Sequence, residues 1–450
     1  DKCDEALADG KVMHHVANLF EEGGSDIWFE REAGELLPAG TACAGCGHDG
    51  FRKEMDILDV WFDSGVSHAA VVEKNPLLQS PADLYLEGSD QHRGWFHSSL
   101  LAAVGTRDAA PYKAVLTHGF VLDEKGRPMS KSVGNVVAPE KVIKQYGAEI
   151  LRLWVATQDY RNDTRVGDAI LKQVSEAYRR IRNTARYILG NIHDFDPATD
   201  SVADHELCEI DRWALSRLEG LVNRVLQAYE AYDFHVLYHA VHNFCAVDMS
   251  AFYLDVLKDR LYTSAKQGPA RRSAQTAMYR ILDALTRMMA PVLSFTAEEI
   301  WSFLPGKREA SAHLAEFPSF QASLVNAELE AKYDRLLAVR SDVAKVLELA
   351  RAGKTIGHSL DARVELAAGG DLGALLASEA GQLADLFIVS QVDLCDSLEK
   401  GTTGENLPEL QIRVSKANGE KCSRCWNYAT SVGADAEHPE ICHRCLEALS

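Results

Sequence analysis

The chain has 450 residues, of which 46% are hydrophobic, so it is long enough for two to four domains with substantial cores. No stretch approaches the roughly 18 consecutive apolar residues of a membrane-spanning helix, and the first residues lack the basic and apolar segments of a signal peptide. These features exclude a membrane protein and predict a cytoplasmic one. The chain begins at Asp1 rather than at a methionine, which indicates a start within a domain.

The charge balance is strongly acidic, with 47 Lys and Arg against 66 Asp and Glu and a net charge of −19. Taken alone, this balance disfavours nucleic-acid binding, because phosphate contacts need cations. Two local clusters of basic residues run against it, at 172–186 and at 271–280. Each cluster is either an RNA-binding stripe or an ordinary solvated helix face.

Residues 55–165 alternate short apolar runs with a helical stretch. The pattern predicts strands at 83–87, 114–117 and 120–122, and a helix over 92–104 between the first two strands. Strand–helix–strand alternation is typical of a parallel α/β sheet, in which ligands bind at the carboxyl ends of the strands. Glu87, Gly88, Asp90 and His118 lie at such ends.

Long segments with helical periodicity follow. They predict a bundle of helices over 168–192, 205–232, 234–263, 269–290 and 294–303. A further helix is expected over 326–353. Alternating strands at 362–366 and 409–414 then predict a small α/β or α+β segment before the cysteine-rich tail.

The tail carries the clearest metal-binding pattern. Two Cys-x-x-Cys pairs, Cys422/Cys425 and Cys442/Cys445, are separated by sixteen residues. This spacing is typical of a tetrahedral zinc site, and four cysteine ligands leave no open position, so the zinc would be structural. Two redox-active pairs are the alternative. The neighbouring residues suit either contact with single-stranded RNA or packing around the metal: Arg424, Trp426, Tyr428, His443 and Arg444.

A third pair, Cys43 and Cys46, is followed by His48. Two thiolates make only half of a zinc site, and Cys3 is treated as isolated. A glycine-rich hairpin without a metal is therefore the favoured interpretation. The alternative is a second metal whose other ligands lie outside this chain.

A loop with one lysine between two serines suits a nucleotide triphosphate. The ammonium of Lys131 is a point charge for phosphate oxygens, the hydroxyls of Ser130 and Ser132 are short donors, and glycines at 126 and 134 allow movement. On its own the string could equally be a solvated loop. It resembles the Lys-Met-Ser-Lys-Ser signature of class I aminoacyl-tRNA synthetases in four of five positions, and we call these residues the signature loop: Pro128, Met129, Ser130, Lys131 and Ser132.

Two further strings precede this loop, Asp-Val-Trp-Phe-Asp-Ser-Gly at 59–65 and Glu-Gly-Ser-Asp-Gln-His-Arg-Gly-Trp-Phe at 87–96. In this order and spacing, the three strings resemble the bacterial isoleucyl-tRNA synthetase family. The resemblance continues through the helical region to the zinc tail and covers essentially the whole chain.

The resemblance implies a ligase that activates L-isoleucine with ATP and transfers it to the 3′ end of tRNA(Ile). Lys131 would stabilise charge on the phosphates during adenylate formation, assisted by Ser130 and Ser132. Mg²⁺ would accompany ATP, and one zinc would be structural. The residues expected to bind the substrate or the adenylate are Glu87, Gly88, Asp90, Gln91 and His118. A helix-terminal charge partner is the alternative role of Glu87.

The fold class implied is an α/β Rossmann-like catalytic half-domain followed by an α-helical bundle anticodon-binding domain and a small C-terminal zinc-binding module. The expected divisions are the end of an editing insertion (1–50), the half-domain (51–165), the bundle (166–320), an α+β junction (321–415) and the tRNA-contacting tail (416–450). A monomer is expected.

Besides Pro128 in the signature loop, the chain departs from the family because the other class I signature, His-x-Gly-His, is absent from its sequence. The chain therefore resembles the C-terminal half of the enzyme, and we expect it not to form the adenylate alone. Two alternatives stay open. One is a non-catalytic, zinc-stabilised tRNA-binding module, and the other is a zinc ribbon on an unrelated nucleotidyltransferase.

Overall fold

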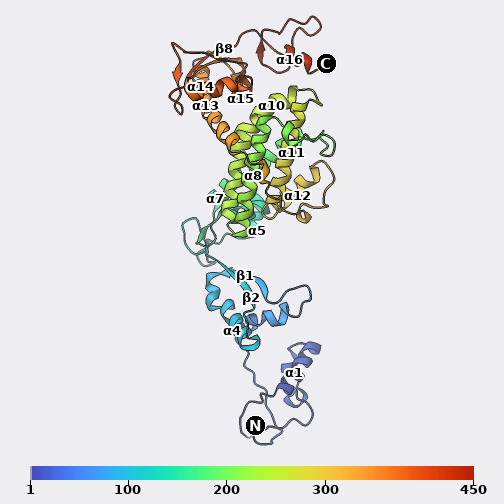
Figure 1. Ribbon diagram of the computed structural model, residues 1–450. Coiled ribbons are helices and arrows are strands. Elements are labelled where there is room, and N and C mark those ends of the chain that lie inside the picture. Colours follow the sequence, from blue (N-terminus) through green and yellow to red (C-terminus); the bar gives the residue numbers. More distant parts are fainter. Residues whose placement is uncertain (1–2, 450) are drawn as a thin grey trace. The chain divides into compact units, whose positions relative to one another are not determined.

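The computed structural model describes residues 3–449. The chain forms two compact units, Asp1–Thr117 and His118–Ser450. Each unit is described by itself below, and Figure 1 gives the element labels. Among the described residues, no helix combines the length and apolar character needed to cross a membrane.

The first unit is built around a strand–helix–strand segment. Strands β1 (Ala82–Gly88) and β2 (Tyr112–His118) pair, and helix α4 (Trp95–Arg107) connects them. The amide of Ala82 donates to the carbonyl of Pro111 at 2.9 Å, so both strands start at the same end and run in parallel, as predicted. The unit's other elements are α1 (Gly10–Gly23), α2 (Ile27–Glu30), α3 (Val60–Gly65) and the short turns Ala33–Glu35, His68–Val72 and Ser89–Arg93.

The second unit opens with the segment that holds the signature loop. Strand β3 (Val121–Leu122) pairs in parallel with β4 (Thr164–Arg165), and α5 (Pro139–Tyr146) and α6 (Ala148–Thr157) lie between them in sequence. The expected parallel pairing is therefore present in two separate two-stranded pieces. Gly119 is required just before β3, because a Cβ there would lie 2.5 Å from the carbonyl oxygen of Asn162.

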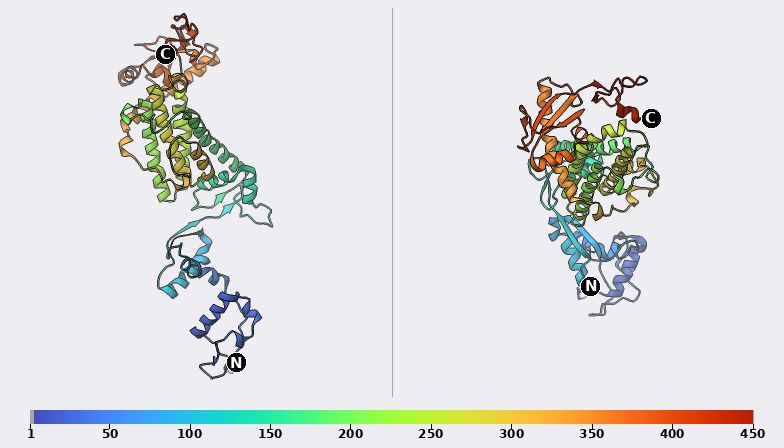
Figure 2. Two further views of the ribbon diagram at one scale, coloured as in Figure 1. Left: turned by 90° about the vertical axis from the view of Figure 1, so that its right-hand side faces the viewer. Right: turned by 45° about the horizontal axis from the view of Figure 1, so that its top comes forward.

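A helical bundle follows, as predicted (Figures 1 and 2). Its apolar residues recur every three or four positions, as in α7, where Val174, Ile181 and Ile188 are buried. Each such side chain contributes about 1.5–3 kcal/mol on burial. The helices are α7 (Asp168–Asn191), α8 (Glu209–Glu230), α9 (Phe234–Asn243), α10 (Leu254–Thr263), α11 (Pro269–Met289), α12 (Ser294–Phe303) and α13 (Ala327–Ala352).

The single helix expected over 234–263 differs in the structure. A π-helical segment, Phe244–Tyr253, separates α9 from α10. Its buried side chains include Phe252 and Tyr253, and the ring of Phe252 packs edge-on against Trp213 of α8 at 5.1 Å. The wider π turns change the face that the helix presents after this point.

The C-terminal part contains a small mixed sheet and the cysteine-rich tail. The sheet has the order β6-β5-β8-β7, with β5 parallel to β6 and antiparallel to β8. Its elements are β5 (Ala362–Ala367), α14 (Gly370–Ser378), α15 (Leu383–Phe387), β6 (Gln391–Leu394), β7 (Thr402–Thr403) and β8 (Gln411–Lys416). The tail adds the hairpin β9 (Glu420–Lys421) and β10 (Tyr428–Ala429) and the short helix α16 (His443–Glu447).

Candidate zinc centre and signature loop

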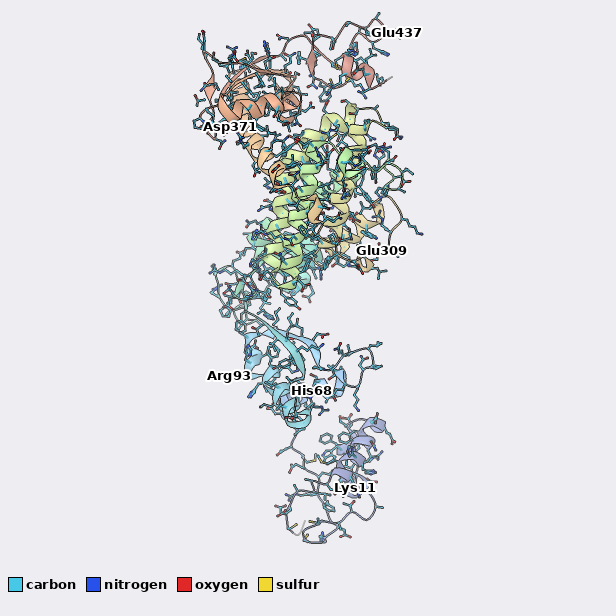
Figure 3. The ribbon with its side chains drawn as sticks, viewed as in Figure 1. Lys11, His68, Arg93, Glu309, Asp371 and Glu437 are labelled. Carbon is cyan, nitrogen blue, oxygen red and sulfur yellow. The ribbon has the colours of Figure 1, made fainter. Side chains whose placement is uncertain are left out.

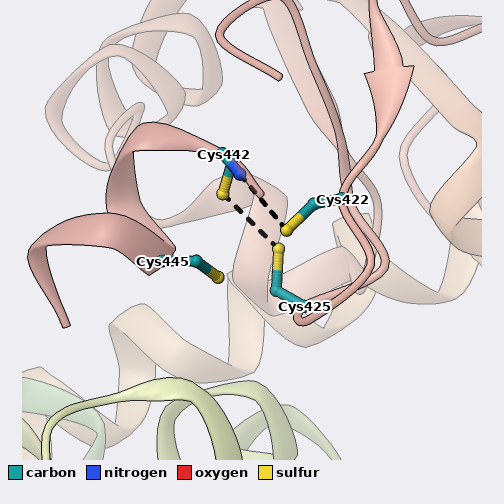
Figure 4. A group of neighbouring side chains, drawn as sticks. All are labelled: Cys422, Cys425, Cys442 and Cys445. Atoms are coloured by element: carbon teal, nitrogen blue, oxygen red, sulfur yellow. Dashed lines mark hydrogen bonds between the residues drawn. The ribbon is translucent and has the colours of Figure 1, made fainter. Parts of the chain in front are cut away.

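The four tail cysteines meet at one point, as the sequence predicts. The thiols of Cys422, Cys425, Cys442 and Cys445 are buried and lie within 4.8 Å of one another (Figure 4). Two come from the β9–β10 hairpin and two from the start of α16. This donor set fits a tetrahedral metal with thiolate ligands. We call residues 419–448 the cysteine knuckle.

Backbone groups prepare one of these thiols for a metal. Burial opposes ionisation of Cys422, but amide N–H groups of Cys425, Cys442 and Arg424 outweigh it and lower the pKa of Cys422 to about 6. The amide of Cys442 lies 3.3 Å from the Cys422 sulfur. A thiolate is the form of cysteine that binds zinc, so a lowered pKa of Cys422 fits a metal site at these four cysteines.

The two arginines of the knuckle are used for docking against α10. Arg444 forms two hydrogen bonds with the carboxylate of Asp259, at 2.5 and 3.0 Å, and Arg424 donates to the carbonyl of Thr263. Of the alternatives left open for these two cations, the structure favours packing. Trp426 remains 60% exposed and Lys421 lies over its ring at 5.8 Å.

A crevice of about 750 Å³ is lined by residues of the knuckle, α10, α13 and α15. Trp426 and Tyr262 are both on its lining and are about 60% exposed. Tyr428 is half-buried, and His443 is exposed. The aromatic rings of Trp426 and Tyr262 therefore remain accessible for stacking.

Three cysteines of the first unit also lie together. The sulfur of Cys3 is 3.6 Å from that of Cys43 and 3.4 Å from that of Cys46. The interpretation of Cys3 as isolated is therefore wrong, since the chain returns to it forty residues later. Hydrogen bonds from the amides of Cys46 and Gly45 lower the pKa of Cys43 to about 7. No fourth metal-ligand side chain joins the three among residues 3–449.

The signature loop is held in place by hydrogen bonds to Asn135, whereas its Lys131 is exposed. Asn135 is the anchor: its amide donates to the Asp123 carboxylate at 3.0 Å and to the Pro128 carbonyl at 3.1 Å, and its oxygen accepts from the Ser130 amide at 3.0 Å. Met129 packs against the core of the second unit. Lys131 is exposed, and no ion pair or hydrogen bond occupies its ammonium among the described residues.

Asp123 supports this anchor and was not predicted from the sequence. Hydrogen bonds from Asn135 and from the amide and guanidinium of Arg127 hold the pKa of Asp123 well below its usual range. The carboxylate therefore stays ionised at neutral pH, and its support for the loop is lost only in strong acid. The signal available in the sequence was the pairing of Asp123 and Asn135 at the two ends of the loop.

The first prediction concerns this anchor. Replacing Asn135 by alanine removes three hydrogen bonds that fix the loop, so trypsin should cleave after Lys131 several-fold faster in the variant. Mass spectrometry of a digestion time course measures the rate. Asn162→Ala, on another loop of the same unit, is the control. Equal cleavage of the Asn135 variant and the wild type would show that the anchor does not hold the loop.

The predicted adenylate-binding residues of the first unit lie at the end of β1. Glu87 and Asp90 are exposed, and Gly88 is buried. Gln91 accepts from the amide of Trp95 at 2.9 Å, which positions the start of α4, and donates to Asp90 at 3.0 Å. The carboxylate of Glu87 faces solvent and is free to accept a hydrogen bond.

His118 lies in the second unit, next to Gly119. It is half-buried, and its Nδ1 is 2.9 Å from the Gly119 carbonyl. A second histidine was not predicted: His68, labelled in Figure 3, is 3% exposed. Its Nδ1 is 3.0 Å from the Gly65 carbonyl, and its Nε2 has no hydrogen-bond partner among the described residues.

Three segments of the chain match known protein families. Residues 1–167 match the family "tRNA synthetases class I (I, L, M and V)", residues 211–366 the "Anticodon-binding domain of tRNA ligase", and residues 419–448 the "Zinc finger found in FPG and IleRS". Residues 1–167 are therefore identified as a class I tRNA synthetase segment. The same chain carries an anticodon-binding domain and, in the cysteine knuckle, a match to the zinc-finger family.

Similarity extends along the entire chain. The isoleucine–tRNA ligase of Syntrophotalea carbinolica is 69% identical over 450 residues, and that of Geobacter sulfurreducens is 60% identical over 452. Each match covers 100% of this chain and 48% of the relative, so the chain spans about half the length of these relatives. The crystal structure of the Agrobacterium radiobacter K84 agnB2 LeuRS-tRNA-LeuAMS complex shares the fold over 64% of this chain and 36% of that one, with a TM-score of 0.52 and 20% identity.

Proposed function

We propose that this chain is the C-terminal half of an isoleucine–tRNA ligase, which activates L-isoleucine with ATP and transfers it to tRNA(Ile). The observation that carries the proposal is the 69% identity, over all 450 residues, with the ligase of Syntrophotalea carbinolica. A cytoplasmic, monomeric enzyme fits this role.

In this proposal the signature loop and the end of β1 have separate roles in the activation step. Lys131 places a positive charge beside the ATP phosphates as pyrophosphate leaves, and Ser130 and Ser132 donate to phosphate oxygens. Lys131 is exposed and its ammonium has no partner among residues 3–449, which supports this role. The solvent-facing carboxylate of Glu87 accepts from a ribose hydroxyl or the substrate ammonium.

The other proposed contacts position the adenylate, the metal ions and the tRNA. Gly88, Asp90, Gln91 and His118 line the adenylate, and Mg²⁺ enters with ATP and is held mainly by its phosphates. The knuckle holds one structural zinc through its four cysteines, which fits their burial and mutual distances. The bundle and the knuckle bind tRNA.

The second candidate function is a non-catalytic tRNA-binding module. It is favoured by the absence of His-x-Gly-His from these 450 residues, since that signature supplies the rest of the ATP site in the family. The two candidates differ in whether these residues take part in activation when they are joined to the signature.

One experiment separates them. The 450-residue chain should show no isoleucine-dependent ATP–pyrophosphate exchange, whereas the same residues in a chain that also carries His-x-Gly-His should show it. Both chains should bind a tRNA(Ile) transcript more tightly than a non-cognate tRNA. Exchange by the 450-residue chain would show that His-x-Gly-His is not needed for isoleucine activation. Absence of exchange in both chains, with tRNA binding intact, would favour the binding module.

A further inference from the structure

The turn before the signature loop carries two acidic residues that have different partners. Asp123 accepts hydrogen bonds from Asn135 and Arg127 and so supports the loop. Glu124, the next residue, accepts instead from the amide of Ala169 in the first turn of α7, at 3.1 Å and across 45 residues of sequence. This turn therefore connects the signature loop to the first helix of the bundle.

Gly167, the residue directly before α7, makes room for the Glu124 side chain. A Cβ at this position would lie 1.8 Å from Cγ of Glu124 and 2.1 Å from its Oε1, which is far closer than such atoms can approach. The φ angle of Gly167 is 179°, an extended conformation that any residue adopts. The missing side chain of Gly167 therefore serves the contact with Glu124 and is not required by the backbone conformation.

Glu124 also supplies a cap that α7 does not have in its own sequence. The amides in the first turn of a helix have no acceptor within the helix, and Gly167 at the N-cap of α7 offers no side-chain acceptor. The carboxylate of Glu124 provides an acceptor from outside the helix, and its negative charge is favourable at this end of the helix. The start of α7 and the turn before the signature loop therefore fix each other's position.

The segment that follows the signature loop is hydrogen-bonded to the same turn of α7. At the end of α5, Gln145 donates to the Asp168 carboxylate at 3.3 Å, and the hydroxyl of Tyr146 also donates to it. Asp168 is the first residue of α7, directly before the Ala169 that Glu124 contacts. Both flanks of the loop are therefore held by two consecutive residues of α7. We call this arrangement the α7 clamp, which consists of Glu124, Gly167, Asp168 and Ala169.

We propose that Glu124 is a positioning residue for isoleucine activation, because it fixes the signature loop, and with it Lys131, to the start of α7. A charge that stabilises the ATP phosphates must be held in one place, since a displacement of about 1 Å can lower a rate about 10²-fold. One exposed contact of this kind adds little to global stability. The effect of Glu124 is therefore expected on the rate of activation. The inference rests on the proposed function, which takes Lys131 as the residue that acts on ATP.

The first test is isoleucine-dependent ATP–pyrophosphate exchange by a chain that carries both class I signatures. Glu124→Ala should lower kcat about 10-fold and change KM for isoleucine little, because the loop acts on the phosphates. Glu124→Gln keeps an oxygen that accepts from the Ala169 amide and should retain most of the rate. The control is Glu140→Ala. Glu140 is exposed on α5, forms no ion pair or side-chain hydrogen bond among residues 3–449, and should change kcat by about twofold or less.

A second variant breaks the contact without changing a charge. Gly167→Ala places a methyl group where the Glu124 side chain lies, so it should lower kcat by about the same factor as Glu124→Ala. The double variant Glu124→Ala/Gly167→Ala should be no slower than either single variant, because both changes remove one and the same contact. Gly190→Ala is the matched control: it lies in the same helix, its Cβ would meet nothing within 4 Å, and it should keep the wild-type rate.

A comparison in the Lys131→Ala background separates positioning from a general loss of stability. Glu124→Ala should cause no further loss of exchange there, because Glu124 acts through the Lys131 ammonium. The same fractional loss with and without Lys131 would overturn the positioning role. Wild-type kcat in both Glu124→Ala and Gly167→Ala would also overturn it. So would a Glu124→Gln variant that is as slow as Glu124→Ala, since the hydrogen bond to Ala169 would then not be the cause.

Proteolysis of the 450-residue chain tests the α7 clamp independently of activity. Trypsin should cleave after Lys131 several-fold faster in Glu124→Ala and Gly167→Ala than in the wild type, whereas Gly190→Ala should not change the rate. If Lys131→Ala keeps full exchange activity, the proposed role of Lys131 fails, while faster cleavage still supports the clamp. If Lys131→Ala loses activity but neither clamp variant is cleaved faster, the clamp is refuted and the proposed function stands.

Discussion

Replacing Lys131 by alanine, in a chain that carries both class I signatures, is expected to lower the rate of isoleucine activation by about 10²–10³-fold, which is the usual effect of removing one group that stabilises transition-state charge. The ammonium is exposed and has no intramolecular partner among the described residues, so its loss should leave the loop folded. Isoleucine-dependent ATP–pyrophosphate exchange measures the rate. Isoleucine affinity should change little, because Lys131 acts on the phosphates.

The control for this variant is Lys125→Ala. Lys125 is also exposed, lies six residues before Lys131 and forms its only described hydrogen bond through its backbone amide, to Asp123. Its replacement removes the same charge from the same segment and should change exchange less than threefold. If the two variants lose activity equally, general electrostatics of the segment would explain the result. Full activity of Lys131→Ala would remove this residue from the chemistry.

Replacing Cys442 by serine is expected to remove one zinc per chain and to unfold the cysteine knuckle. Structural zinc supplies about 10–16 kcal/mol in small zinc-finger peptides, far more than the hydrophobic contacts of a segment this short. Among the described residues, the apolar side chains packed against the four cysteines are Ala429, Val432 and Ile441. Metal analysis of protein purified without chelators measures the zinc.

Trypsin reports the unfolding locally. Arg424 and Arg444 are held against α10 by Thr263 and Asp259, so cleavage after these arginines should become rapid only when the knuckle opens. Cys395→Ser, outside both cysteine clusters, is the control and should keep its zinc and its resistance. Retention of the metal by Cys442→Ser would show that Cys442 is not a ligand.

Much of the fold could be predicted from local patterns. The strands at β1 and β2 and the helices α7, α11 and α12 begin and end within a few residues of the predicted bounds, because apolar periodicity and breaks such as Gly268-Pro269 act locally. The four tail cysteines were found because their spacing is short and regular. The placement of the catalytic residues and the five domain divisions stay predictions.

Other features depend on contacts between distant residues and left no local signal. Cys3 meets Cys43 only after the intervening helices turn the chain back. Arg271 looks like a surface cation in sequence, yet Asp194, seventy-seven residues earlier, neutralises it inside the bundle. The π segment at 244–253 has the same apolar character as a regular helix, so the sequence predicted one continuous helix there.

The docking of the cysteine knuckle on α10 has a consequence for how metal supply affects the molecule. Arg424 and Arg444 each lie between the two cysteines of a pair, directly before the second cysteine. The positions of the four sulfurs therefore determine where both guanidinium groups can reach. The rings of Trp426 and Tyr262 line the same crevice, and a knuckle released from α10 would no longer hold them together. Loss of the zinc would therefore separate these two rings, and the buried core of the bundle would stay intact.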